Sequence, residues 1–249
     1  MAVPESLPNL IVIGAMKCAT TALHRYLDLH PQIVMAAQKE MNFFVGPSVA
    51  EGNAEQAWHR GNWHRGVDWY AEHFADAPVR GEASPSYTSP SFPEAAARMA
   101  AVVPDARLIY LVRDPIDRAL SQYEHHRRMG TEQRGLEEAL LDAGSQYLQR
   151  SAYHARLQPY LDRFPGERIA IVLQEDLLDR RHETLASLYR FAGVDDEFWA
   201  SELDALVHVG GAPPELDGCL EKAMIVRVAE DVARLRSLTN RDLAEWRSY

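Results

Sequence analysis

Short apolar runs alternate with helical patterns along this chain, and this alternation constrains its fold more than any other feature of the sequence. Four runs have the β-rich composition of buried strands, at residues 10–13, 33–35, 107–112 and 168–173, and residues 79–83 are a candidate fifth strand. Helical patterns occupy residues 19–27, 92–103, 115–123 and 152–164. Beyond Asp176 the patterns are mainly helical, with one apolar stripe formed by Val228, Val232, Leu235 and Leu238. Such alternation predicts an α/β fold, a parallel sheet flanked by helices on both faces, with a mainly helical C-terminal part.

Composition narrows the class of protein. A chain of 249 residues without internal repeats, low-complexity tracts or an evident linker predicts one domain over residues 1–249. The 47% hydrophobic content exceeds that of disordered chains. With 26 Lys and Arg against 36 Asp and Glu, the net charge of −10 argues against nucleic acid as a partner. An acidic chain can still bind a small anion in a local basic pocket.

The cysteines and the apolar runs predict a cytoplasmic protein. Cys18 and Cys219 are far apart in sequence, so the chain has neither a disulfide framework nor a cysteine-based zinc signature. No apolar run approaches the ~20 residues of a membrane span. Residues 1–10 lack the basic start and apolar core of a secretory signal. Nothing in the sequence indicates an oligomeric state.

The loop after the first predicted strand has the composition of an anion site. Gly14 permits a tight turn, and the helix that follows has N–H groups without partners at its positive end. Lys17 adds a full charge, and Thr20 and Thr21 add hydroxyl donors. A plain turn with a threonine cap and a solvated lysine is the alternative. The loop is not a Walker A motif, because no second glycine stands beside Lys17.

A second anion site is predicted at the end of the fourth strand. Arg113 leaves the carboxyl end of that strand, the edge at which α/β folds bind ligands. Asp114 can cap the next helix and Pro115 fits its first position. Ser121 lies on the same helix face, and an arginine fork with a hydroxyl suits a phosphate. An exposed Arg–Asp pair with an ordinary helix serine is the alternative.

Taken together, these segments resemble the sulfotransferases that use 3′-phosphoadenosine 5′-phosphosulfate (PAPS). The likeness is to the branch that contains heparan sulfate N- and O-sulfotransferase domains and soluble bacterial members. Seven landmarks carry it in order: Gly-Ala-Met-Lys-Cys-Ala-Thr-Thr-Ala-Leu (14–23), His30-Pro31, Lys39-Glu40-x-x-Phe43-Phe44, Gly66-x-Asp68-Trp69-Tyr70, Gly81-Glu82-Ala83-Ser84-Pro85-x-Tyr87, Arg113-Asp114-Pro115-x-x-Arg118-Ala119-x-Ser121-x-Tyr123, and Tyr153-His154 followed by Arg163-Phe164-Pro165.

The resemblance implies a P-loop-like fold and a set of site residues. The loop of Gly14, Ala15, Met16, Lys17, Cys18, Ala19, Thr20 and Thr21 would hold the 5′-phosphosulfate of PAPS. Arg113 and Ser121 would hold the 3′-phosphate, and Tyr153 would lie by the nucleotide. Region 208–227 differs from the family's basic loop over the cofactor, with Lys222 and Arg227 as candidate replacements.

By the same resemblance, Glu40 matches the catalytic base and Lys17 a catalytic cation. A right-handed crossover makes the first two strands parallel, so Glu40 emerges at the same sheet edge as Lys17. An ordinary loop carboxylate paired with Lys39 is the alternative for Glu40. Phe43 and Phe44 are expected to pack in the core.

The expected reaction is in-line transfer of a sulfuryl group from PAPS to a hydroxyl, in preference to an amine, with 3′,5′-bisphosphoadenosine as the product. The acceptor would be a small molecule, a glycolipid or a saccharide. Sulfuryl carries less charge than phosphoryl, so no metal is expected. Two alternatives stay open: a P-loop kinase or NTPase that uses Mg-ATP, with Asp176 as a faint Walker B residue, and a non-catalytic nucleotide-binding protein of the same fold.

Overall fold

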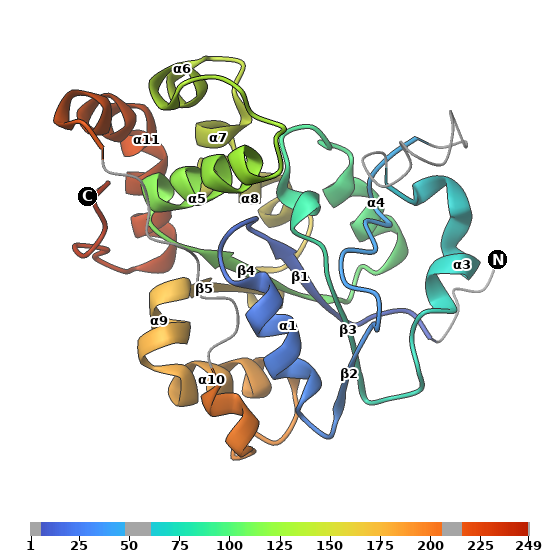
Figure 1. Ribbon diagram of the computed structural model, residues 1–249. Coiled ribbons are helices and arrows are strands. Elements are labelled where there is room, and N and C mark those ends of the chain that lie inside the picture. The colour runs from blue at the N-terminus through green and yellow to red at the C-terminus, as the bar shows by residue number, and fades with distance from the viewer. Residues whose placement is uncertain (1–5, 48–60, 206–215, 249) are drawn as a thin grey trace.

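The computed structural model describes residues 6–47, 61–205 and 216–248, and its centre is a parallel sheet (Figure 1). The strands are β1 (Leu10–Gly14), β2 (Ile33–Met35), β3 (Val79–Ala83), β4 (Arg107–Val112) and β5 (Ile169–Leu173). They lie in the order β2-β3-β1-β4-β5, and every neighbouring pair is parallel. The five predicted strands and their parallel arrangement are therefore confirmed.

Helices cover both faces of the sheet, as the alternation predicts. They are α1 (Thr20–Asp28), α3 (Gly66–Ala71), α4 (Ala95–Val102), α5 (Pro115–Arg128), α6 (Leu136–Leu141), α7 (Gln146–Gln149), α8 (Tyr153–Leu161), α9 (Gln174–Asp179), α10 (Arg181–Ala192) and α11 (Gly218–Thr239). Short 3₁₀ turns occur at Trp63–Arg65, Pro85–Thr88, Gly166–Arg168 and Ser201–Asp204. Helix α1 lies on one face with α10, where the Tyr189 hydroxyl donates to the Tyr26 carbonyl at 3.5 Å. Helix α4 packs against α8 on the other face. No helix among the described residues combines the length and the apolar character that crossing a bilayer requires.

The strand order creates a crevice at the carboxyl ends of β1 and β4. From β1 the chain first runs outward to β2 and returns through β3, and it then crosses to β4 on the other side of β1. In open parallel sheets such a reversal leaves a gap at the carboxyl edge, where ligands bind. Both central strands are buried along nearly their whole length, so this edge rests on the hydrophobic core.

A second, smaller core joins α5 to the C-terminal helix α11. Its buried members include Ile116 and Leu120 of α5, Leu140 of α6 and Met224 of α11. The predicted stripe of α11 is confirmed at Val228, Val232 and Leu235, which are buried, but Leu238 is 39% exposed. Two successive steps of three residues rotate position 238 by about 120° away from Val232, because a helix turns once in 3.6 residues. Leu238 therefore leaves the buried side.

Candidate active site

The loop between β1 and α1 is a tight connection that only glycine allows at its start. A Cβ on Gly14 would lie 2.3 Å from Thr88 Oγ1 and 2.9 Å from Tyr110 Cε2, so no larger residue fits. Lys17 and Ala19 have left-handed φ angles of 71° and 63°, which are rare for residues with a side chain. Backbone strain of this kind concentrates at ligand-binding segments.

The amino end of α1 has no side-chain cap, which decides against the alternative of a plain turn with a threonine cap. Ala19 is the residue before the helix and forms no capping hydrogen bond. The hydroxyls of Thr20 and Thr21 make no hydrogen bond with any described residue, and Thr21 is partly exposed. The first N–H groups of the helix and these hydroxyls therefore remain as free donors at the positive end of the helix.

Lys17 lies in a positive environment without an acidic partner. It forms no ion pair within the described ranges 6–47, 61–205 and 216–248. Burial lowers the pKa of its ammonium group, and the nearby charges of Arg128, Arg113 and Arg118 lower it further. A bound anion would relieve this repulsion, so the surroundings of Lys17 suit a phosphate or sulfate.

Arg113 is brought to the Lys17 loop by the pairing of β4 with β1. Its Nη1 lies 3.5 Å from the Lys17 carbonyl, and its Nη2 lies 3.6 Å from Asp117 Oδ2, a loose ion pair. Asp114 caps α5 as predicted, since its Oδ1 accepts from the N–H groups of Ile116 (2.8 Å) and Asp117 (3.0 Å). Ser121 lies two turns along α5, partly exposed and without a hydrogen bond to the described residues. Both predicted anion sites thus meet at one sheet edge.

Arg150 adds a cation that the sequence analysis did not identify. Its Nη1 is 3.7 Å from Met16 Sδ, a weak acceptor, and its Nε is buried without a partner. Burial, followed by the charge of Arg118, lowers the pKa of Arg150 to about 10. Because 134 residues separate Arg150 from Met16, no local pattern could have indicated this contact. An unsatisfied guanidinium beside the loop is a further sign that an anion belongs there.

Arg118 lies behind these groups and is structural. Its side chain is fully buried, and its guanidinium donates to Ser151 Oγ at 2.6 Å, to Gln122 Oε1 at 2.8 Å and to the Tyr147 carbonyl. All of these acceptors are neutral. Arg118 therefore contributes positive charge to the crevice without presenting its guanidinium to a ligand.

The side chains of Cys18 and Tyr153 form the floor beneath the loop. Both are fully buried, and Cys18 Sγ lies 3.5 Å from the Tyr153 hydroxyl. Burial raises the pKa of the Cys18 thiol to about 11, so it is neutral at physiological pH. The predicted contact of Tyr153 with a nucleotide would need side-chain surface that the structure shows covered.

Glu40 lies near the sheet edge on the β2–β3 side. Its backbone N–H donates to the Ala83 carbonyl at 3.0 Å, and the next residue of that segment, Ser84, donates its own N–H to Val12 of β1 at 3.0 Å. The Glu40 side chain is 50% exposed and its Oε1 is 2.6 Å from Lys39 Nζ. The pairing with Lys39 is therefore present, and it holds the carboxylate at the surface. Phe43 is fully buried, as predicted.

His125 of α5 is influenced by charges from both halves of the site. Burial lowers the pKa of its imidazole, and the charges of Lys17 and Arg128 lower it further, whereas Glu40 opposes them. His125 therefore lies within electrostatic range of both Lys17 and Glu40. It is one helical turn beyond Ser121, so helical spacing from the predicted site could have identified it.

The C-terminal segment covers the start of α5 beside Arg113. Ser248 donates its N–H and its hydroxyl to Asp114 Oδ2 at 3.0 and 3.1 Å. Arg247 Nε lies 3.3 Å from Asp117 Oδ1, so Asp117 stands between Arg247 and Arg113. Arg227 instead donates to the Leu141 carbonyl, and Lys222 is exposed. Of the divergent region 208–227, residues 208–215 lie outside the described residues.

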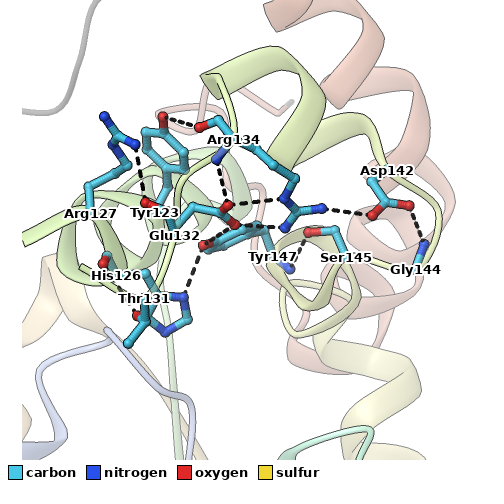
Figure 2. Close-up of polar contacts among 10 residues, drawn as sticks. All are labelled: Tyr123, His126, Arg127, Thr131, Glu132, Arg134, Asp142, Gly144, Ser145 and Tyr147. Atoms are coloured by element: carbon cyan, nitrogen blue, oxygen red, sulfur yellow. Dashed lines mark hydrogen bonds and ion pairs between the residues drawn. The ribbon is translucent and has the colours of Figure 1, made fainter. Parts of the chain in front are cut away.

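A second charged cluster follows α5, and Figure 2 shows it closed upon itself. Arg134 lies between two carboxylates, with Nη2 2.6 Å from Glu132 Oε2 and Nη1 2.8 Å from Asp142 Oδ2. The Tyr147 hydroxyl donates to Glu132 Oε2 at 3.1 Å and lies 2.9 Å from His126 Nδ1. This cluster, the Glu132 network, shapes the connection from α5 to α6.

The acidic residues after β5 do not form a metal site. Asp176 accepts two hydrogen bonds from Arg241, at 2.8 and 3.1 Å, and a third from Arg180. No group of three or more potential ligand residues suited to a metal ion occurs in the part of the chain that the structure describes. The faint Walker B likeness of Asp176 therefore reflects a carboxylate that two arginines already neutralise.

Comparison with known proteins agrees with this geometry. A sequence profile described as the sulfotransferase family matches residues 8–198. The solved structure of a sulfotransferase from Alicyclobacillus acidocaldarius is 30% identical, covers 96% of this chain and 98% of its own, and has a TM-score of 0.79. Bifunctional heparan sulfate N-deacetylase/N-sulfotransferase 2 of Homo sapiens is 28% identical over 214 residues, which is 76% of this chain. Membrane-associated sulfotransferase kil1 of Dictyostelium discoideum is 40% identical over 123 residues, or 47% of this chain. The matched region spans 22% of the length of each of these two curated relatives.

Proposed function

This chain belongs to the sulfotransferase family, and from that premise we propose that it transfers a sulfuryl group from PAPS to an acceptor hydroxyl, in preference to an amine. One observation carries the proposal. Lys17, Arg113 and Arg150 converge at the carboxyl edge of β1 and β4, and among the residues that the structure describes they have one loose carboxylate contact, at 3.6 Å. These cations repel one another, although the chain as a whole has a net charge of −10. A bound anionic ligand would remove that repulsion.

The residues present fit PAPS at both of its anionic ends. The amino end of α1, Lys17 and the hydroxyls of Thr20 and Thr21 would hold the 5′-phosphosulfate. Arg113 and Ser121 would hold the 3′-phosphate, and Arg150 adds positive charge beside the loop. When bound, PAPS supplies the sulfuryl group that is transferred.

The chain's own residues then have two tasks. Lys17 and the N–H groups at the start of α1 stabilise the negative charge that grows on the departing phosphate, which is where such donors contribute most to catalysis. Glu40 accepts the proton of the attacking hydroxyl, for which its carboxylate must exchange its bond to Lys39 for one to the acceptor. The cations are supplied by the protein and sulfuryl carries little charge, so the proposal includes no metal.

The acceptor in this proposal is a small molecule, a glycolipid or a saccharide of low charge. The acidic surface slows the approach of polyanions. We further propose one domain over residues 1–249, because α11 joins α8 through Asp231, which accepts from the His154 and Ala155 N–H groups at 2.9 Å. Two free cysteines favour a cytoplasmic location.

A thermal-shift titration with 3′,5′-bisphosphoadenosine, 5′-AMP and Mg-ATP in parallel tests the donor. A ligand at ~100 Kd adds about 2.7 kcal/mol to the free energy of unfolding. We expect a large shift with the bisphosphate that does not require Mg²⁺, and a much smaller one with 5′-AMP. A shift with Mg-ATP alone would replace the proposal with a kinase, and binding of the bisphosphate without transfer to any acceptor would favour a non-catalytic protein.

Glu40→Gln tests the base. We expect the turnover of sulfur-labelled PAPS, with the best acceptor from a panel of hydroxyl compounds, to fall about 10²–10⁴-fold while the affinity for 3′,5′-bisphosphoadenosine stays unchanged. His125→Gln is the matched comparison, because His125 is a second proton acceptor within electrostatic range of Lys17. If Glu40→Gln kept full turnover and His125→Gln lost it, the histidine would be the base.

A further inference from the structure

Glu82 of β3 is a buried carboxylate with no assigned role in the proposed reaction. It is fully buried, and it accepts three hydrogen bonds from hydroxyl groups. Its Oε1 accepts from Tyr70 and Tyr87, both at 2.5 Å, and its Oε2 accepts from Ser84 at 2.7 Å. No cation forms an ion pair with it in the described part of the chain. Burying a carboxylate that is bonded only to neutral donors is energetically unfavourable, which indicates a functional reason for its presence.

Two of these hydroxyls connect Glu82 to the segment that carries Glu40. Ser84 Oγ accepts the backbone N–H of Asn42 at 3.0 Å. The Tyr87 hydroxyl accepts the backbone N–H of Phe43, also at 3.0 Å. Each hydroxyl has one proton, and donation of that proton to Glu82 turns its lone pairs toward the segment. The carboxylate therefore sets the direction of both links.

Residues 40–43, the base segment, need such links because their backbone is strained. Glu40 and Asn42 have left-handed φ angles of 61° and 50°, which residues with side chains adopt only when their surroundings hold them. The Glu40 N–H bonds to the Ala83 carbonyl at 3.0 Å, and the Phe43 ring stacks on Tyr70 with centroids 4.1 Å apart. Every one of these contacts leads to β3 or to a residue bonded to Glu82.

We infer that Glu82 is a positioning residue: its carboxylate, through the hydroxyls of Ser84 and Tyr87, holds the base segment so that Glu40 faces the acceptor. The inference rests on the proposed function of Glu40 as the base. The charge itself matters because an amide in place of the carboxylate would donate to one hydroxyl. That hydroxyl would then lose the acceptor for its own proton, and its bond to the base segment would weaken.

The test is a double-mutant cycle of Glu82→Gln and Glu40→Gln. In the wild-type background we expect Glu82→Gln to lower kcat about 10²-fold, as a displaced catalytic group does, with unchanged affinity for 3′,5′-bisphosphoadenosine. In the Glu40→Gln background it should cause no further loss, because Glu82 acts only through Glu40. Additive losses, an unchanged kcat or an equal loss of bisphosphate affinity would each overturn the inference.

Two further variants keep the test decisive if Glu82→Gln unfolds. Ser84→Ala removes the link to Asn42 together with the hydroxyl that donates to Glu82 Oε2. Tyr87→Phe removes the link to Phe43 together with one of the two hydroxyls that donate to Glu82 Oε1, and in both variants the Glu82 carboxylate stays in place. Each should lower kcat without changing bisphosphate affinity, and each loss should disappear in the Glu40→Gln background. Failure of the base proposal has a different signature, since Glu40→Gln alone would then retain full activity.

Discussion

Cations lie on two sides of α5, and their partners differ sharply. Arg134 of the Glu132 network is bonded to two carboxylates, at 2.6 and 2.8 Å. Lys17 and Arg150, at the crevice, have no carboxylate partner among the residues that the structure describes, and Arg150 Nε is buried without any acceptor. The difference distinguishes structural charges from functional ones in an acidic protein. Charges that are paired within the chain stabilise the fold, whereas unpaired charges at a sheet edge indicate a ligand-binding site.

Lys17→Ala should give the largest effect on the crevice side. Loss of one charge-stabilising donor costs about 2.7–4 kcal/mol in the transition state, so kcat should fall about 10²–10³-fold. Stability should be unchanged or slightly higher, since the substitution relieves repulsion from Arg128 and Arg113. Steady-state kinetics and chemical denaturation measure the two quantities. Arg25→Ala, at an exposed arginine of α1 that has no role in the proposed site, is the control and should leave kcat unchanged.

Glu132→Gln should give the next largest effect, and on stability instead of activity. Hydrogen bonds from Arg134 lower the pKa of Glu132 from its ordinary 4.5 to about 2. A lowered folded-state pKa means that the carboxylate stabilises the fold above pH 4.5 and loses this contribution as the pH falls toward 2. Removal of charged hydrogen bonds costs about 1.5–3 kcal/mol. Denaturation midpoints of variant and wild type should therefore differ at pH 7 and converge near pH 2.

The control for this prediction is Glu137→Gln, at an exposed glutamate in the first turn of α6. It should leave the free energy of unfolding nearly unchanged at every pH. A stability difference for Glu132→Gln that stays constant from pH 7 to pH 2 would show that packing, and not the charge, stabilises the network.

Arg113→Ala should have a smaller effect, confined to ligand affinity. The guanidinium already has a loose partner in Asp117 at 3.6 Å, so its loss disturbs the fold little. We expect affinity for 3′,5′-bisphosphoadenosine to fall about tenfold, which corresponds to 1.4 kcal/mol, and affinity for 5′-AMP to change less. Calorimetric titration with each nucleotide measures the two changes in affinity. An equal loss of affinity for both nucleotides would show that Arg113 does not bind the 3′-phosphate.

The smallest effect is expected at Arg234, an exposed arginine of α11 that pairs with Glu230 one turn earlier. Exposed pairs of this spacing contribute about 0.3–0.5 kcal/mol. Arg234→Ala should therefore lower the free energy of unfolding by no more than that, with normal turnover and nucleotide affinity. If the free energy of unfolding fell as much as in Glu132→Gln, the strength of a charge's pairing in this structure would not indicate its contribution to stability.

Local sequence was enough to predict the strands and one helix start. Residues 33–35 and 107–112 form strands with the predicted bounds, because β-rich apolar runs can be buried on both faces of a parallel sheet. Residues 79–83 also form a strand with the predicted bounds, although Arg80 and Glu82 interrupt its apolar sequence. Asp114 caps α5 as its position before Pro115 indicated. The threonine cap considered for α1 does not form, since Ala19 in a left-handed conformation precedes that helix and leaves the hydroxyls free.

The residues of the crevice divide in the same way. By itself the sequence determined that Lys17 and Arg113 would each follow a strand of one parallel sheet, since each stands directly after an apolar run, and the structure shows that these two strands are neighbours. Only the tertiary structure decided that Arg150 joins them, that Tyr153 is covered, and that Glu82 reaches the segment of Glu40 through two hydroxyls. The physical reason is range: caps and strand patterns depend on neighbours a few residues away, whereas electrostatic contacts and burial depend on groups that only the packed chain brings together.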